Sequence, residues 1–569
     1  MIIDKVKLKG FRNFADAEVN FNGNSLIMGA NDVGKTNLIF ALRLLLDKSL
    51  SERDLEPLST DFHVNASGSQ VENYEIVIFF KDIVKDSARS ILKGYVSESD
   101  STVFCLNANI MGEYQVSLGP DLEHLEVVQS RFYLKYINLK YVQSRRDLKK
   151  FIDLEKKHLL KIAKDERSEM ESQSDADQTA LISKSLATVN QQIKQLNYVK
   201  SSTSLVNAEL KSLSHINDQY SVRLDTGSIQ VDQFIDNLQL GAEKNGSALA
   251  LGGDGRNNQI LLALWKAKSE REFDPNHHVT FYCVEEPEAH LHPHQQRRLA
   301  TYLNESLSGQ VFITSHSPQI VEKFQPSSIV RLLTKAGHTI AASDGCSNCI
   351  DTAWDELGYR MSILPAEAFF SSCVFLVEGP SEELFYHELA KAIGIKLDFY
   401  NISILSVDGV QFRVYANILE ALEIPYVIRT DNDVSKVPRK EEKRLAGIIR
   451  CTEIAKVKGL DCFPVAPVTM NATPESIVET GIWSNYSSKY NPLGLYLAKV
   501  DLETDLYDEL PTQMKEFSDK QDKNEVIEYL KSKKAINMRK FIKSYQSDFA
   551  GLSSGLLAQP LLQAIQFAK

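Results

Sequence analysis

The spacing of apolar and polar residues at the start of the chain predicts short strands that lead into a buried helix. Ile3, Val6 and Leu8 alternate with polar residues, and a period of two is typical of a strand with one buried face. Residues 37–46 are densely apolar, which predicts a buried helix. The same criteria predict further strands at 19–21, 25–28, 75–80 and 132–142.

The chain changes character after about residue 145. Residues 147–213 are rich in Lys, Glu, Gln and Ser and contain neither proline nor glycine. Apolar residues recur there in steps of four and three, as in the seam of packed helices, at Ile182, Leu186, Val189, Ile193 and Leu196. Because the seam covers only about two heptads, it favours a helical hairpin or a dimerisation arm over a long coiled coil. The alternative is a helical layer packed inside one subunit.

Strand-like and helix-like segments alternate in the second half of the chain. Strands are predicted at 279–284, 311–314, 374–377, 402–407 and 426–429, and a helix at 382–393. Such alternation is typical of mostly parallel sheets covered by helices. We therefore expect an α/β unit formed by residues 1–146 and 241–350, a helical insertion at 147–240, and a second α/β unit at 351–569.

Composition excludes several classes of protein. Of 569 residues, 43% are hydrophobic and 24% are charged, which is ordinary for a globular protein. The formal charge of −11 argues against general coating by nucleic acid, so any such contact must be local. No apolar stretch approaches the ~18 residues of a membrane span, and seven cysteines do not form an even disulfide framework. We expect a cytoplasmic protein with no membrane partner.

The segment between the predicted strand at 25–28 and the predicted helix carries a phosphate-binding pattern. Residues 29–36 read G-x-x-x-x-G-K-T. Glycines let backbone amides turn toward phosphate oxygens, and the following helix presents its positive end to them. We expect Lys35 to reach the β- and γ-phosphates of ATP and Thr36 to bind Mg²⁺.

Further parts of a nucleotide site follow far downstream. The strand at 279–284 runs into Glu285, which can hold Mg²⁺ through water, and Glu286, which can polarise the attacking water. A glycine-rich stretch at 251–256 contains Gly253, and His316 follows the strand at 311–314. The order of these motifs resembles the ABC-class ATPase heads of SMC and RecF proteins. That resemblance implies a nucleotide site completed by a second head and built from Asn31, Gly34, Lys35, Thr36, Asn37, Gly253, Glu285 and His316, with Glu286 catalytic.

Carboxylates also follow two strands of the second α/β unit. Glu378 ends the strand at 374–377, and Asp431 and Asp433 end the strand at 426–429. Side chains two apart on a strand share a face, and α/β folds place their sites at the carboxyl ends of their strands. All three side chains are carboxylates, which offer only oxygen ligands and so suit Mg²⁺ or Mn²⁺. Their placement resembles the Toprim fold of topoisomerases and primases.

Two features lie beyond these strands. Asp501, Glu503 and Asp505 form a third carboxylate cluster, which could hold a second ion ~4 Å from the first and so clamp a phosphodiester. Residues 531–543 then contain six Lys or Arg and no acid. This run is either a solvated helix face or a contact for the phosphate backbone of DNA.

An ABC-type head with an inserted helical dimerisation arm, followed by a C-terminal Toprim domain, resembles the OLD nuclease family and, within it, the nucleases of Gabija anti-phage defence. The resemblance implies a double-stranded DNA endonuclease that assembles as a dimer or tetramer beside a UvrD-like helicase. It implies Lys534 as the catalytic lysine, with Lys533 as the alternative register. The implied metal ligands are Glu378, Asp431, Asp433 and Asp501, with Glu382, Glu503 and Asp505 possible. The rival interpretation is a RecF-type repair ATPase whose Toprim unit binds DNA without cutting it, and a topoisomerase- or primase-like enzyme is a weaker third.

Overall fold

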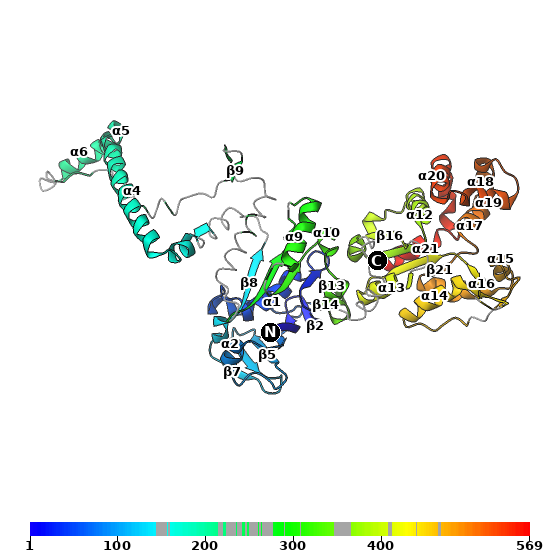
Figure 1. Ribbon diagram of the computed structural model, residues 1–569, viewed down its shortest axis with the longest axis horizontal. Helices are drawn as coiled ribbons and strands as arrows, with labels where there is room; N and C mark the ends of the chain where they lie inside the picture. Colours follow the sequence, from blue (N-terminus) through cyan, green and yellow to red (C-terminus); the bar gives the residue numbers. More distant parts are fainter. Residues whose placement is uncertain are drawn as a thin grey trace. The chain divides into compact units, whose positions relative to one another are not determined.

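The computed structural model (Figure 1) describes residues 1–569 except 66, 144–155, 158–159, 214–219, 223–230, 232–234, 236–241, 245–246, 250–259, 261–262, 264–276, 290, 306, 308, 346–365, 408–411, 438, 440 and 465–467. The chain forms two compact units. One unit comprises Met1–Gln143, Pro275–Glu288 and Pro293–Lys569, and the other comprises Ser144–Asp274 and Ala289–His292. The predicted junctions near residues 146, 240 and 350 fall outside the described residues and stay predictions.

An antiparallel sheet forms one layer of the N-terminal part. Its order is β2-β1-β4-β5-β6-β7, and every neighbouring pair is antiparallel. Ile3, Val6 and Leu8 of the first strand are fully buried, as their alternation predicts. The strands are β1 (Ile2–Phe11), β2 (Phe14–Asn20), β4 (Asn73–Lys81), β5 (Thr102–Asn109), β6 (Tyr114–Gly119) and β7 (Glu126–Val128).

A second sheet carries the phosphate-binding segment. Its order is β14-β13-β3-β12-β11-β8, parallel except for the β13–β14 hairpin. Helix α1 (Lys35–Leu46) buries Leu38, Leu42 and Leu45 in the core of this part of the chain. The strands are β3 (Ser25–Met28), β8 (Ile137–Gln143), β11 (Val279–Glu285), β12 (Gln310–Thr314), β13 (Ile329–Lys335) and β14 (His338–Ala341). Helices α2 (Asp86–Ile91), α9 (Pro293–Glu305) and α10 (Pro318–Val321) complete this part.

The strand predicted at 132–142 is wrong at its start. Residues Phe132–Lys135 form a 3₁₀ helix, and β8 begins only at Ile137. The turn carries the fully buried Tyr133 under the end of α1, where its hydroxyl donates to the Leu45 carbonyl at 2.9 Å. A buried phenol needs such an acceptor, and this requirement outweighs the strand propensity of the segment.

The predicted apolar seam lies on one long helix of the second unit. Helix α4 (Glu169–Gln195) has 27 residues and is followed by α5 (Asn197–Ser201) and α6 (Ser204–Leu213). Ile182 and Val189 of the seam are exposed, so the described part of the chain does not pack them inside one subunit. A hairpin of β9 (Ala242–Lys244) and β10 (Ser247–Leu249) belongs to the same unit. None of the helices described here combines the length and the hydropathy that a membrane crossing requires.

The C-terminal part contains a four-stranded parallel sheet of order β16-β15-β17-β21. Its first three strands agree with the predicted ones to within one residue at each end. They are β15 (Cys373–Val377), β16 (Ile402–Ser406) and β17 (Tyr426–Thr430), joined by β21 (Leu495–Leu497). Helices α12 (Pro380–Ala392) and α21 (Gln559–Ala568) share a core with Phe375, Val377 and Val427 on one face of the sheet. Helices α13 (Phe412–Ala421) and α14 (Ala446–Val457) contact β17 and β21, respectively (Figure 1).

A small antiparallel sheet is formed by segments on either side of α14 in the chain. It consists of β18 (Val434–Lys436), β19 (Glu442–Leu445) and β20 (Val468–Thr469) in that order. Short helices then surround the end of the C-terminal sheet. They are α15 (Pro474–Glu479), α16 (Ile482–Tyr490), α17 (Leu502–Glu509), α18 (Pro511–Ser518), α19 (Lys523–Lys531) and α20 (Lys534–Tyr545).

Candidate functional sites

The loop between β3 and α1 has the backbone shape that its glycines predict. Gly29 and Gly34 have φ of 153° and 103°, which favour glycine. A Cβ on Gly34 would lie 2.1 Å from Nδ2 of Asn13, so no larger residue fits there. Lys35 is buried, and its Nζ donates to the carbonyls of Gly29 at 3.1 Å and Ala30 at 2.8 Å. The ammonium therefore lies inside the loop, where ATP phosphates would meet it.

Two asparagines, Asn13 and Asn37, hold this loop in place through hydrogen bonds. Asn13 Nδ2 donates to the Val33 carbonyl at 2.7 Å, and Asn37 Nδ2 donates to Asn13 Oδ1 at 2.8 Å. Asn37 Oδ1 in turn accepts from Arg12 at 2.9 Å. The predicted nucleotide-binding residue Asn37 thus supports the loop, whereas Asn31 and Thr36 are exposed.

The paired glutamates separate into one buried and one exposed side chain. Glu285 Oε2 accepts from the Tyr141 hydroxyl at 2.6 Å, and its enclosed Oε1 has no partner among the described residues. Glu286 has a left-handed φ of 44°, which is unusual outside glycine and common at functional sites. This turn directs its side chain outward, with Oε1 at 3.6 Å from His316 Nε2.

The electrostatics of this site favour a neutral His316. Burial lowers the pKa of His316, and the positive charge of Lys35 lowers it further. Burial also lowers the pKa of Lys35, although Glu286 and Asp32 act in the opposite direction. A neutral imidazole beside Glu286 can hydrogen-bond a water or a phosphate oxygen. The predicted residue Gly253 lies outside the described residues.

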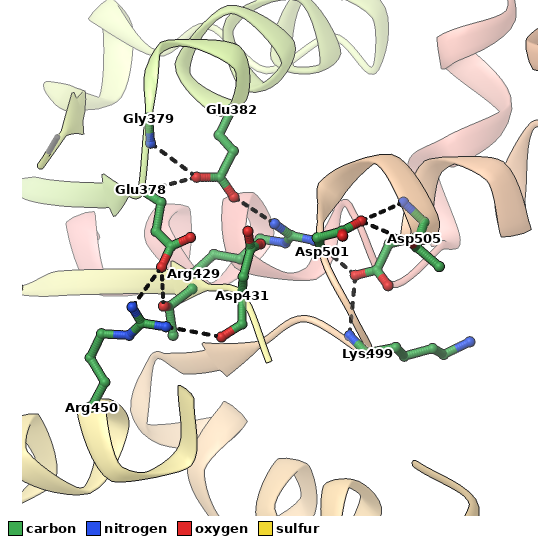
Figure 2. A network of polar contacts seen from close by, with 11 residues as sticks. Glu378, Gly379, Glu382, Arg429, Asp431, Arg450, Lys499, Asp501 and Asp505 are labelled. Carbon is green, nitrogen blue, oxygen red and sulfur yellow. Dashed lines mark hydrogen bonds and ion pairs between the residues drawn. The ribbon is translucent and has the colours of Figure 1, made fainter. Parts of the chain in front are cut away.

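The parallel sheet of the C-terminal part brings its predicted carboxylates to one edge. Glu378 follows β15 and Asp431 follows the neighbouring β17, so the two side chains meet at the carboxyl ends of the strands (Figure 2). Thr430 Oγ1 donates to Glu378 Oε1 at 2.9 Å. Burial, followed by the charges of Glu382 and Glu378, raises the pKa of Asp431 well above its usual range. Burial and the two neighbouring glutamates therefore disfavour the charged form of Asp431.

Two cations of the chain pair with the predicted metal ligands. Arg450 of α14 lies 3.0 Å from Glu378 Oε1 and 2.7 Å from Asp433 Oδ2. Lys531 Nζ lies 2.6 Å from Asp501 Oδ2. Within the described ranges, no three acidic, histidine or cysteine side chains are grouped as a metal cluster.

A buried charge network lies behind the carboxylates. Arg429 of β17 donates to Glu382 Oε1 at 2.7 Å and to Asp505 Oδ2 at 2.8 Å (Figure 2). Glu382 Oε2 accepts the backbone N–H groups of Glu378 at 2.5 Å and Gly379 at 3.2 Å. Both oxygens of Glu382 are thus engaged inside the protein. Burial raises the pKa of Glu382, against the opposing effect of Arg429.

Helix α17 places the third carboxylate cluster. Asp501 caps the helix, and its Oδ1 accepts from Thr504 N at 2.8 Å. Burial raises the pKa of Asp501, but hydrogen bonds from Lys531 and Thr504 outweigh burial and lower it overall. Glu503 is buried, and burial raises its pKa against the charge of Lys534.

The two candidate lysines differ in their surroundings. Burial lowers the pKa of Lys534, but the charges of Glu503 and Asp431 outweigh it and raise the pKa overall. The Lys534 ammonium therefore interacts electrostatically with carboxylates of both clusters, those around Asp431 and those of α17. Lys533 and Lys534 are both exposed at the start of α20. The choice between the two lysines stays a prediction.

The donor set fits a hard divalent cation. Asp431 Oδ1 is enclosed and has no hydrogen-bond partner among the described residues. All the predicted ligands are carboxylates, which Mg²⁺ and Mn²⁺ prefer. Sequence reasoning missed Arg450, Arg429 and Thr430, which hold these carboxylates, since nothing in the sequence near those residues points to a partner.

Comparison with known proteins identifies the N-terminal part. Residues 1–114 and 121–321 match the family model described as AAA ATPase domain, and they make up more than half of the 569 residues. The chain belongs to this family. This AAA ATPase also matches the model "Overcoming lysogenization defect protein-like, TOPRIM domain" over residues 369–433, which include Glu378, Asp431 and Asp433. The predicted fold class, an ATPase head followed by an OLD-like Toprim domain, is confirmed.

Relatives of this AAA ATPase include two named nucleases. "Endonuclease GajA" of Bacillus cereus (strain VD045) is 24% identical over 567 residues, which cover 95% of this chain and 94% of the relative. "OLD nuclease" of Thermus scotoductus is 23% identical over 210 residues, or 35% of this chain and 39% of the relative. Among solved structures, an SMC head bound to the C-winged helix domain of ScpA matches with a TM-score of 0.38 and 18% identity, over 60% of this chain and 97% of that one.

Proposed function

We propose that this protein is a metal-dependent DNA endonuclease of anti-phage defence, regulated by nucleotide binding to its ATPase unit. One observation carries the proposal. Carboxylates that follow β15 and β17 and that begin α17 lie at one edge of a Toprim sheet. Lys534 is close enough to them that the charges of Glu503, Asp431 and Asp501 raise its pKa. The names of the relatives, Endonuclease GajA and OLD nuclease, agree with this chemistry.

In phosphodiester hydrolysis, the carboxylates would bind the metal ions and Lys534 would stabilise the developing negative charge. Glu378, Asp431 and Asp433 would hold one Mg²⁺ or Mn²⁺, and Asp501 would hold a second. Bound divalent cations neutralise the phosphate and lower the pKa of the attacking water. The ammonium of Lys534 stabilises the charge that develops on the scissile phosphate of double-stranded DNA. Arg429 and Thr430 keep the acidic side chains oriented toward the same edge.

The ATPase unit supplies a separate phosphate site. Lys35 lies inside the loop that would receive the β- and γ-phosphates, and the exposed Thr36 would bind Mg²⁺. Glu286 and His316 lie 3.6 Å apart and would position the attacking water. ABC-type heads complete this site with the glycine-rich stretch around Gly253 of a second head. We therefore propose a dimer or tetramer, and a UvrD-like helicase of the GajB type as its partner in the cytoplasm.

Plasmid cleavage tests the proposal. Supercoiled plasmid is incubated with the purified protein and Mg²⁺ or Mn²⁺, with and without ATP and EDTA. We expect cutting that EDTA abolishes, and that Glu378→Gln and Asp431→Asn lose while ATP binding is unchanged. Glu453→Gln is the matched control, because Glu453 lies in the surface pairs of α14 with Arg413 and Lys456. Full cleavage by Glu378→Gln would show that cutting does not depend on these carboxylates, and DNA binding without cleavage by the wild type would favour the RecF-type rival.

A further inference from the structure

Arg450 joins the two carboxylates that stand at the ends of neighbouring strands. Its Nη1 lies 3.0 Å from Glu378 Oε1 (Figure 2), and its Nη2 lies 2.7 Å from Asp433 Oδ2. Nη2 also donates to the backbone carbonyl of Asp431 at 3.2 Å. The Arg450 side chain is only 9% exposed. It therefore occupies the position from which a cation would contact these carboxylates.

The backbone around Arg450 fixes this position. The N–H of Gly447, in the first turn of α14, donates to the Asp433 carbonyl at 3.1 Å. A Cβ on Gly447 would lie 2.4 Å from the Asp431 carbonyl oxygen, so only glycine lets the helix approach so closely. The hairpin of β18 and β19, between Asp433 and α14, is thus held at both of its ends beside these carboxylates. Arg450 is held one turn along the helix from this contact.

The pairing leaves charge and hydrogen-bonding capacity unsatisfied. One guanidinium pairs with two carboxylates, those of Glu378 and Asp433. Arg450 Nε and Asp431 Oδ1 are both enclosed without a hydrogen-bond partner among the described residues. An Mg²⁺ or Mn²⁺ ion carries twice the charge and approaches carboxylate oxygens to about 2.1 Å, closer than the nitrogens of Arg450. A divalent cation would therefore compete with the arginine for these oxygens.

We propose that Arg450 is the resident counter-cation of the metal-free site, that a divalent cation displaces it from Glu378 and Asp433, and that the freed guanidinium then binds a DNA phosphate. The planar fork of arginine suits a phosphate as well as it suits two carboxylates. Arg450 is a positioning residue in the first state and a substrate contact in the second. This inference rests on the proposed function, because it assigns a metal and DNA to the same carboxylates.

Metal titration of the full-length protein tests the exchange. Mn²⁺ binding is measured by calorimetry in the absence of DNA and nucleotide, and the binding that Glu378→Gln removes is assigned to this site. Arg450→Ala removes the competing cation, so we expect Mn²⁺ to bind about fivefold or more tightly than to the wild type. In EDTA the variant should melt at a lower temperature than the wild type, because its carboxylates repel one another, and Mn²⁺ should raise its melting temperature more. Arg413→Ala, which removes a surface arginine of α13, should behave as the wild type.

DNA binding tests the second half of the exchange. Fluorescence anisotropy of a labelled duplex is measured in EDTA and in Ca²⁺, with the integrity of the duplex checked on a gel. We expect Arg450→Ala to bind DNA as the wild type does in EDTA and several-fold more weakly in Ca²⁺. An equal loss in both conditions, or Mn²⁺ affinity no tighter than that of the wild type, would overturn the proposal.

A second variant covers the case in which Arg450→Ala does not fold. A lysine ammonium lacks the planar fork with which arginine pairs with two carboxylates. Arg450→Lys should therefore compete less well with a metal ion, so this variant should also bind Mn²⁺ more tightly than the wild type. Unchanged affinity in that variant overturns the exchange. Failure of the nuclease proposal looks different, since Glu378→Gln would then leave plasmid cleavage intact whatever Arg450 does to metal affinity.

Discussion

Arg429→Ala removes the only charge that the described residues place between Glu382 and Asp505. The Arg429 side chain is 3% exposed, and those of Glu382 and Asp505 are 7% and 8% exposed. Its two nitrogens lie 2.7 Å and 2.8 Å from their carboxylates, so one arginine satisfies both acids. Without it, two carboxylates remain buried beside each other in the C-terminal core. We expect a large loss of stability confined to this part of the chain.

The size of the loss follows from the burial of the network. Removing one partner of a buried ion pair costs about 3–5 kcal/mol, because it leaves an uncompensated charge in the interior. For a domain of about 150–250 residues, each kcal/mol shifts the melting temperature by about 2–4 °C, so the melting temperature should fall by about 6–20 °C. The surface pair of Arg413 and Glu453, with 66% of the Arg413 side chain exposed and 3.6 Å between the charges, should be worth less than about 1 kcal/mol.

Differential scanning calorimetry of full-length Arg429→Ala and Arg413→Ala makes the comparison, at pH 5 and at pH 8. Burial already raises the pKa values of Glu382 and Asp505, and loss of Arg429 raises them further. A carboxyl whose pKa is raised in the folded state is most stabilising at low pH, and that contribution is lost as pH rises through the folded pKa. The deficit of Arg429→Ala should therefore be smaller at pH 5 than at pH 8. A shift no larger than that of Arg413→Ala at both values would refute the reasoning.

Four further substitutions have defined outcomes. Lys35→Ala should weaken ATP binding about 10- to 100-fold, measured with a fluorescent nucleotide, while cleavage without nucleotide persists; loss of that cleavage in a folded variant would contradict two separate sites. Lys534→Ala should slow plasmid cleavage ~10²–10³-fold with DNA binding retained, whereas Lys533→Ala should cut normally, and the reverse pattern would shift the assignment by one residue. Gly447→Ala should destabilise the C-terminal part by about 1–3 kcal/mol in thermal melts, and a melt like that of the wild type would show that α14 adjusts without strain.

Sequence reasoning succeeded where local pattern and chemistry coincide. The phosphate-binding loop lies between β3 and α1 because glycines, a buried strand and a helix are all encoded within residues 25–46. Glu378 and Asp431 meet because both directly follow strands that pair in parallel. The hydrophobic run of a buried parallel strand is readable from the chain, and its carboxyl end then locates the side chains that follow.

The parts that sequence reasoning missed depend on distant partners. Arg450 is one of several basic residues after Asp433, and its sequence neighbours do not reveal that it reaches Glu378, which is 72 residues away. Arg429 was counted as a strand residue, although it neutralises two buried acids. Glu382 was predicted as a possible metal ligand, while the structure gives its oxygens to Arg429 and to the backbone. Pairing across the fold, which composition cannot show, decides which carboxylates remain available.

The packing of α21 against β15 determines when the C-terminal core can form during synthesis. Leu561 and Ala564 of this helix are fully buried in the same cluster as Phe375. The sheet face stays open until the ribosome has released residues 559–568. At about 5–20 residues per second, the roughly 140 residues between β17 and the end of α21 take about 7–28 s to translate. All the strands of the ATPase head precede residue 342, so the nucleotide-binding unit can fold during this interval. The proposed DNA-cutting centre is therefore completed after the ATPase head.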